Sequence, residues 1–177
     1  QARYYCCRRL LNIKILKAMR SIMNRTEIEH ILETCELFKG LKKSHIEQLA
    51  DLCTEKKYEG GEYIFCQGDF GEHLYIIFEG HIFLERSIDL GNRKGNVVIE
   101  ALGRGRVLGC WSTLLGEPHF LMSSAICQKP TKVVVIKGSD LRQMMIDSSK
   151  LGFNILERLF LLLRDRIQSA YGAMEKI

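Results

Sequence analysis

The chain has 177 residues, of which 46% are hydrophobic and 27% are charged. This length suits one ordinary domain with a proper core, so collagen-like, low-complexity and disordered classes are excluded. No apolar run reaches membrane-spanning length. The chain has 7 cysteines and no C-x-x-C repeat, which argues against a disulfide scaffold. We therefore expect a cytoplasmic protein.

Residues 1–25 are predicted to form a basic, amphipathic N-terminal arm. Seven of the 26 basic residues lie before the first acid, Glu27, and the remaining 19 basic and 21 acidic residues carry a small negative charge. One helical face of the arm is apolar and comprises Leu11, Ile15, Ala18 and Ile22. We expect a helix that lies on the domain or on a partner chain. The alternative is docking on a membrane surface or an acidic partner.

Capping signals predict three short helices after the arm. Thr26 with Glu29 and Ser44 with Glu47 have the capping-box spacing and are expected to open two short helices. Ser139 is expected to cap a third short helix.

Glycine punctuates the middle of the chain, where 11 of the 15 glycines fall between Gly60 and Gly116. Short β-prone runs lie there and just beyond, at 63–66, 74–78, 81–84, 97–102, 124–127 and 132–136. A polar segment at 89–96 is predicted to be a hairpin loop. This spacing favours a mainly β protein, a compact antiparallel barrel or sandwich with flanking helices.

The last segment, 149–177, is predicted to be one long helix. Its apolar positions alternate at spacings of four and three, beginning with Leu156, Phe160, Leu163 and Ile167 and continuing to Met174. This period is that of a coiled-coil seam, which predicts a dimerisation helix and a parallel homodimer. The alternative is that the same face packs on the chain's own barrel.

Several spaced segments resemble a known family. Residues 61–71 have the sequence Gly-Glu-Tyr-Ile-Phe-Cys-Gln-Gly-Asp-Phe-Gly, and Leu-Tyr-Ile-Ile follows at 74–77 and Glu-Gly at 79–80. Residues 102–109 have the sequence Leu-Gly-Arg-Gly-Arg-Val-Leu-Gly. This series resembles the cyclic-nucleotide-binding domain of catabolite-activator-type regulators, protein kinase A regulatory subunits and nucleotide-gated channels. The resemblance implies a jelly-roll-like β-roll over 26–148 with N-terminal helices, followed by the C-terminal dimerisation helix.

The resemblance also implies a phosphate-binding cassette, and here the chain departs from the family. The family pattern is Phe-Gly-Glu-x-Ala-Leu and then Pro-Arg-Ala-Ala-Ser/Thr, in which Glu accepts from the ribose 2′-hydroxyl and Arg contacts the phosphate. Cys110 stands at the Glu position, His119 at the Arg position, and Met122 replaces the small hydroxyl residue. Losing one buried charged contact costs roughly 2–5 kcal/mol, so we expect weak or absent cAMP and cGMP binding. Stand-alone bacterial domains with Trp-Ser in place of the Glu-containing run are the nearest resemblance.

The candidate ligand-binding residues surround this cassette position: Gly109, Cys110, Trp111, Ser112, His119 and Ser123. No cofactor and no metal are expected, and the candidate effector is a cyclic nucleotide or another small anionic ligand. Two alternatives stay open, a redox role for Cys110 beside a helix start and a purely structural role for Trp111.

No enzyme motif is present, so we expect a non-catalytic sensor or regulatory domain with no catalytic residues. We also expect no DNA binding within this chain. The alternatives are a ligand-free dimerisation or docking module, a regulatory domain of a channel or exchanger, and part of a transcription regulator.

Overall fold

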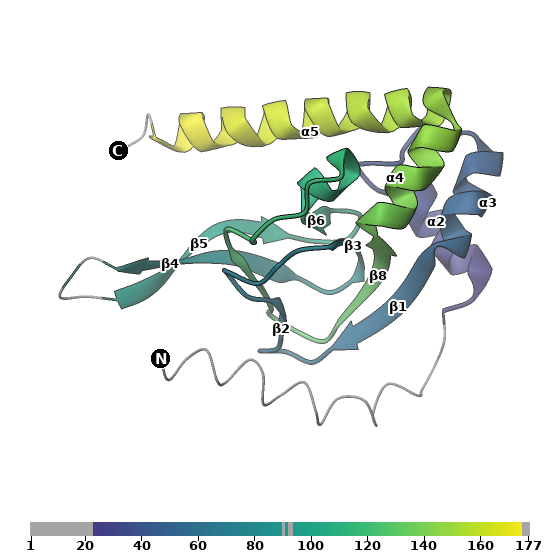
Figure 1. Cartoon of the computed structure of the whole chain (residues 1–177). Coiled ribbons are helices and arrows are strands. Elements are labelled where there is room, and N and C mark those ends of the chain that lie inside the picture. The colour runs from purple at the N-terminus through teal and green to yellow at the C-terminus, as the bar shows by residue number, and fades with distance from the viewer. Residues whose placement is uncertain (1–22, 90, 92–93, 175–177) are drawn as a thin grey trace.

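The computed structural model describes residues 23–89, 91 and 94–174, with the side chains of this range except those of Lys94 and residues 169–174. Most of the predicted basic arm therefore lies outside the described residues. The described chain begins with two helices, α2 (Arg25–Thr34) and α3 (Lys43–Asp51), which lie at the end of the molecule opposite the β4–β5 hairpin (Figure 1).

The strands form two antiparallel sheets of four strands each. One sheet has the order β1-β8-β3-β6, and its strands are β1 (Cys53–Tyr58), β8 (Thr131–Lys137), β3 (His73–Glu79) and β6 (Val107–Gly109). The other has the order β2-β7-β4-β5, and its strands are β2 (Tyr63–Phe65), β7 (Ser124–Cys127), β4 (Ile82–Asp89) and β5 (Lys94–Leu102). The predicted mainly β fold with flanking helices is confirmed.

All six predicted strands are present; β7 has the predicted ends, and the other five have shifted ends. The hairpin loop predicted at 89–96 is too long, because β4 continues to Asp89 and β5 starts at Lys94. The two strands stay paired up to Asp89 and Lys94. Two further strands, β1 and β6, have no counterpart among the predicted runs.

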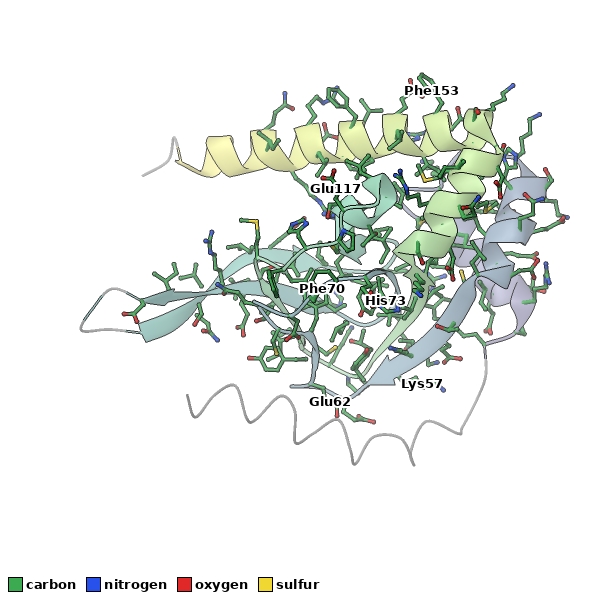
Figure 2. The ribbon with its side chains drawn as sticks, viewed as in Figure 1. Lys57, Glu62, Phe70, His73, Glu117 and Phe153 are labelled. Carbon is green, nitrogen blue, oxygen red and sulfur yellow. The ribbon has the colours of Figure 1, made fainter. Side chains whose placement is uncertain are left out.

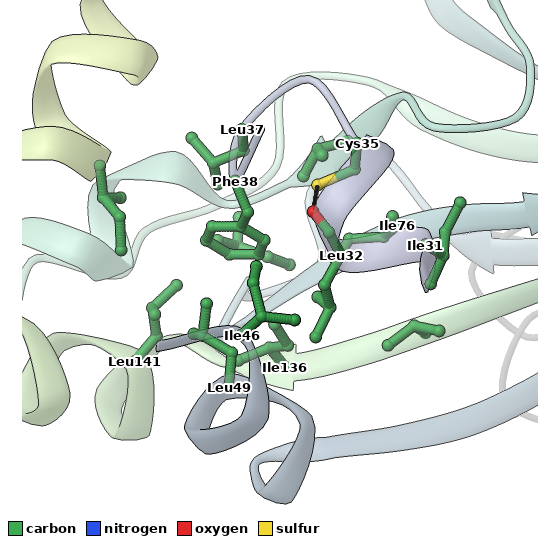
Figure 3. Close-up of a cluster of buried hydrophobic side chains, with 14 of the residues drawn as sticks. Ile31, Leu32, Cys35, Leu37, Phe38, Ile46, Leu49, Ile76, Ile136 and Leu141 are labelled. Atoms are coloured by element: carbon green, nitrogen blue, oxygen red, sulfur yellow. Dashed lines mark hydrogen bonds between the residues drawn. The ribbon is translucent and has the colours of Figure 1, made fainter. Parts of the chain in front are cut away.

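The inner strands β3 and β8 of the first sheet are buried on both faces, which explains their continuous apolar runs. Along β3, Leu74 and Ile76 belong to the cluster beneath the helices, whereas Tyr75 and Ile77 belong to the cluster between the sheets. Strand β8 alternates in the same way. Figure 3 shows the helical cluster, in which α2, α3 and the turn between them cover the sheet; its labelled members include Ile31, Leu32, Phe38, Ile46 and Leu49.

The predicted helix caps are wrong. Helix α2 begins two residues earlier than expected, because Asn24 rather than Thr26 is the N-cap and forms a capping box with Glu27. Helix α3 starts at Lys43 after the N-cap Lys42, and α4 (Gly138–Asp147) follows Lys137, and neither has a side-chain cap. The boundaries follow the burial of apolar positions rather than the hydroxyl residues at Thr26, Ser44 and Ser139.

Helix α5 (Ser149–Met174) lies along one side of the molecule and has two different faces (Figure 1). The inner face packs on the domain through Leu151, Ile155 and Leu159, which are buried. Phe153 points away from the β-roll (Figure 2) and is 67% exposed. None of the described helices, α5 included, is long and apolar enough to cross a membrane.

The predicted dimer seam lies on the outer part of α5. Leu156, Phe160, Leu163 and Ile167 are 39%, 69%, 38% and 55% exposed, so the alternative that this face packs on its own barrel is wrong. The side chain of Met174 lies outside the description. The homodimer itself stays a prediction.

Candidate functional site

A cavity of about 210 Å³ lies between strand β6, the short 3₁₀ helix η2 (Trp111–Leu115), the segment 119–123 and helix α5. The structure brings all six predicted binding residues to its wall: Gly109, Cys110, Trp111, Ser112, His119 and Ser123. Six further residues complete the wall: Phe65, Leu84, Leu108, Leu121, Met122 and Arg166. The wall is therefore mostly apolar, with a few polar groups.

Gly109 provides the backbone conformation that leads the chain from β6 into the cavity wall. Its φ of 120° is one that side chains rarely adopt, and a Cβ at this position would collide with the carbonyl oxygen of His73. The close approach lets β6 pair with β3, where Gly109 faces Leu74, and Cys110 N donates to His73 O at 3.1 Å. The turn then leads directly into η2, which carries Trp111 and Ser112.

Three side chains gather where the family resemblance implies an ion pair with the ligand. Ser112 Oγ lies 2.5 Å from His119 Nδ1, and Cys110 Sγ lies 3.3 Å from Ser112 Oγ and 3.8 Å from His119 Nδ1. Cys110 is buried, at 2% exposure. The three side chains contact one another, and the cluster contains neither the carboxylate nor the guanidinium of the family pattern.

Backbone bonds fix His119 in this place. Gly71 N donates to His119 O at 3.1 Å, and Leu121 N donates to Asp69 O at 2.8 Å. The rings of Phe70 and Phe120 make an edge contact at 5.8 Å on the outside of this junction (Figure 2 labels Phe70). The segment therefore holds a defined position over the cavity.

Helix α5 contributes Arg166 to the site, which the sequence analysis missed. Its guanidinium lies 5.3 Å from the centre of the Trp111 ring, a cation–π contact. Its Nη2 donates to Glu36 Oε1 at 2.9 Å and to Val107 O at 2.9 Å. Trp111 is only partly buried and packs against the helical core, so it serves as core and as cavity wall together.

A small ionic cluster surrounds Arg166. Arg106 pairs with Glu36 at 2.7 Å and with Glu100 at 2.6 Å, and Arg166 Nε lies 3.8 Å from Glu100 Oε1. The cluster joins the turn after α2, strand β5, the segment before β6 and helix α5. Within the described range, no group of three His, Cys, Asp or Glu side chains is arranged to hold a metal ion.

Comparison with known proteins identifies the family. Residues 55–148 match the family model described as "Cyclic nucleotide-binding domain". The chain belongs to the cyclic nucleotide-binding domain family. This confirms the resemblance inferred from the glycine-punctuated segments, and the β-roll has the order of elements that the resemblance implied.

Related proteins extend the likeness. The cAMP-dependent protein kinase type II regulatory subunit of Drosophila melanogaster is 32% identical over 95 residues, which cover 54% of this chain and 24% of that protein. The chain thus spans about a quarter of the length of this curated relative.

Solved structures share the fold. A cyclic nucleotide-binding domain from Methylobacillus flagellatus has a TM-score of 0.72 at 23% identity, covering 86% of this chain and 84% of that chain. The regulatory subunit of a cAMP-independent protein kinase A from Trypanosoma brucei, a triple mutant bound to cAMP, has a TM-score of 0.66 at 23% identity. It covers 86% of this chain and 50% of that chain.

Proposed function

We propose that this chain is a non-catalytic sensor or regulatory domain. Its cavity lacks the Glu and the Arg with which the family pattern contacts the ribose and the phosphate of a cyclic nucleotide. The observation that carries the proposal is the contact cluster of Cys110, Ser112 and His119, at the positions where the family pattern has Glu and Arg. A cyclic phosphate entering here would meet no guanidinium from the cassette, and the ribose would meet a thiol instead of a carboxylate. Weak or absent binding of cAMP and cGMP follows.

Two observations support the proposal. The cavity of about 210 Å³ is smaller than the roughly 300–1,000 Å³ of most small-molecule pockets. The Trypanosoma brucei neighbour belongs to a cAMP-independent kinase and was bound to cAMP as a triple mutant, so independence of cAMP has a precedent on this fold. Among the described residues, the thiols of Cys35, Cys53 and Cys110 form no disulfide, which favours the cytoplasm as the compartment.

Calorimetric titration with cAMP and cGMP tests the proposal. We expect no binding at micromolar concentrations by the unmodified chain. The double variant Cys110→Glu with His119→Arg, which restores the family pair, should gain cAMP affinity by at least about tenfold. The control is His81→Arg with Gln128→Glu, which adds the same charges at exposed positions outside the cavity.

Each result of this titration decides something. A micromolar affinity of the unmodified chain contradicts the proposed weak or absent binding. A folded double variant that still ignores cAMP shows that the missing pair is not the cause of the weak binding. The second candidate is a ligand-free dimerisation or docking module, which the small cavity also supports. It predicts the same silence with both nucleotides, and binding of any other effector in the cavity would contradict it.

We also propose that output passes through a homodimer formed by α5. The support is the exposed row Leu156, Phe160, Leu163 and Ile167, whose spacing suits a two-stranded coiled coil. We expect a dimer by sedimentation analysis, and a monomer for Phe160→Asp. Gln168→Ala, an exposed substitution outside this row, should remain dimeric. A monomeric unmodified chain would contradict the proposal.

A further inference from the structure

Arg166 places a positive charge on the cavity wall from outside the cassette. Within the described part of the chain, it is the only Lys or Arg that lines the cavity. Its Nε is buried and finds no hydrogen-bond acceptor among the described residues. The nearest carboxylate oxygen with which Nε forms an ion pair, Glu100 Oε1, lies 3.8 Å away, which is beyond hydrogen-bonding distance. Most buried donors in proteins have a hydrogen-bond partner, because burying a donor without one is unfavourable.

The rest of the guanidinium is held firmly. Nη2 donates to Glu36 and to the carbonyl of Val107, and the Trp111 ring lies 5.3 Å from the guanidinium carbon. Arginine has five N–H donors in one rigid plane, which suits planar or tetrahedral anions. The guanidinium is therefore bound at Nη2 and keeps donor capacity at Nε.

We propose that the cavity binds a small organic anion and that Arg166 receives its carboxylate or phosphate group. The inference rests on the proposed function, in which the cavity is a sensory site without the family's cassette arginine. The mostly apolar wall suits a compact hydrophobic body, and Ser112 and His119 add polar side chains to the same wall. A cavity of about 210 Å³ restricts the ligand to a small molecule.

The neighbouring charges allow Arg166 to take a new partner. Arg106 contacts both Glu36 and Glu100, at 2.7 and 2.6 Å, so both carboxylates keep a counter-charge if Arg166 turns toward a ligand. Along α5, Arg166 follows Leu159 and Leu162 and is the last described side chain that faces the domain. An anion that competes with Glu36 for Arg166 would thus change how α5 is tied to the domain.

Tryptophan fluorescence tests the inference directly, because Trp111 is the single tryptophan of the chain and touches Arg166. The probes are benzoate, inorganic phosphate and cAMP, each titrated against sodium chloride at constant ionic strength. We expect a saturating change with at least one of them, and the responding probe distinguishes a carboxylate from a phosphate ligand. Arg166→Met should weaken that binding by at least about tenfold.

Matched variants separate the ligand contact from a structural effect. Arg164→Met removes a nearby arginine that pairs with Asp165 on the exposed side of α5, and it should bind like the unmodified chain. Glu36→Gln removes the carboxylate that competes for Arg166 and should tighten anion binding. Arg166→Lys keeps a positive charge and should retain part of the anion affinity that Arg166→Met loses. These two variants keep the test decisive if Arg166→Met fails to fold.

The inference is overturned if none of the three anions changes the fluorescence. It is also overturned if Arg166→Met binds the responding anion as well as the unmodified chain does. The proposed function fails differently, through micromolar cAMP binding by the unmodified chain. Absence of any anion effect leaves the proposed function intact, since weak or absent nucleotide binding is what it states.

Discussion

At the scale of single residues, the candidate site depends on a missing Cβ. Gly109 brings β6 against β3 at a φ of 120°, and the chain then turns to place Cys110 and Trp111 in the cavity wall. Two effects act at this position, the unfavourable backbone conformation and the collision with the carbonyl oxygen of His73. They can be separated, because Gly61 has a φ of 83° but open space around it.

We expect Gly109→Ala to lower the free energy of unfolding by more than about 2 kcal/mol, since strain and collision add. Gly61→Ala should cost only about 1 kcal/mol, the backbone effect alone. Urea unfolding followed by circular dichroism measures both. Equal losses in the two variants would show that the close approach to His73 is unimportant.

His73 gives the domain a predictable pH dependence. Burial lowers the pKa of its imidazole from the ordinary 6.5, and the positive charge of Lys56 lowers it further. The unfolded chain therefore binds this proton more readily, and the contribution of His73 to stability falls as pH drops below about 6.5. Above that value the contribution is constant.

Unfolding experiments from about pH 8 down to about pH 5 check this sign. The stability advantage of the unmodified chain over His73→Gln should shrink as the pH falls. A difference that stays constant over this range, or grows in acid, would contradict the lowered pKa.

The sequence could predict the residues of the cassette wall but not the arginine that completes it. Gly109 to Ser112, His119 and Ser123 lie close together in the chain, and the family resemblance supplied their alignment. Arg166 meets Glu36 across a separation of 130 residues. No local pattern encodes such a contact, and the heptad spacing of α5 draws attention to its apolar residues only.

At the scale of elements, α2 shows why a capping motif does not by itself fix a helix start. Asn24 with Glu27 and Thr26 with Glu29 have the same spacing, and only the first pair caps the helix. Met23, directly before the Asn24 cap, is itself buried at 6% exposure, so the chain already packs on the domain where the helix starts. Tertiary packing thus selects between two local signals of similar strength.

We expect Asn24→Ala to lower the free energy of unfolding by about 1 kcal/mol, because the Glu27 amide loses its acceptor at 2.9 Å. Thr26→Ala, at an exposed position inside the first turn, should change it by less than about 0.5 kcal/mol. Chemical denaturation of both variants gives the comparison. A larger loss of stability for Thr26→Ala than for Asn24→Ala would show that Thr26, as first expected, is the N-cap.

The two missed strands have plain physical reasons. Strand β1 lies at the edge of its sheet and contains Thr54, Glu55, Lys56 and Lys57, so it has no apolar run. Strand β6 has only three residues, too few for any periodic signal. The predicted strands, by contrast, include the runs at 74–78 and 132–136, which are apolar because both faces of their sheet are covered.

At the scale of the whole molecule, one sheet joins two cores. The cluster beneath the helices and the cluster between the sheets share strands β3 and β8. Neither core can be lost without exposing one face of those strands. The domain should therefore unfold as a single cooperative unit.

Two core variants test this coupling, Leu49→Ala in the helical cluster and Ile77→Ala between the sheets. Each should lower the free energy of unfolding by about 2–5 kcal/mol. Trp111 fluorescence and far-ultraviolet circular dichroism should report the same midpoint in both variants. Different midpoints for the two signals would reveal two independently unfolding parts.

The doubly covered sheet also limits how the sequence can change. Along 74–77 and 133–136 each side chain faces one core or the other, so a saturation scan should find no tolerant site in either stretch. Strand β5 is the opposite case, since Val97, Val98 and Ile99 are about half exposed, at 48%, 48% and 57%. We therefore expect sequence changes during evolution to accumulate in the β4–β5 hairpin, while the residues of β3 and β8 change little.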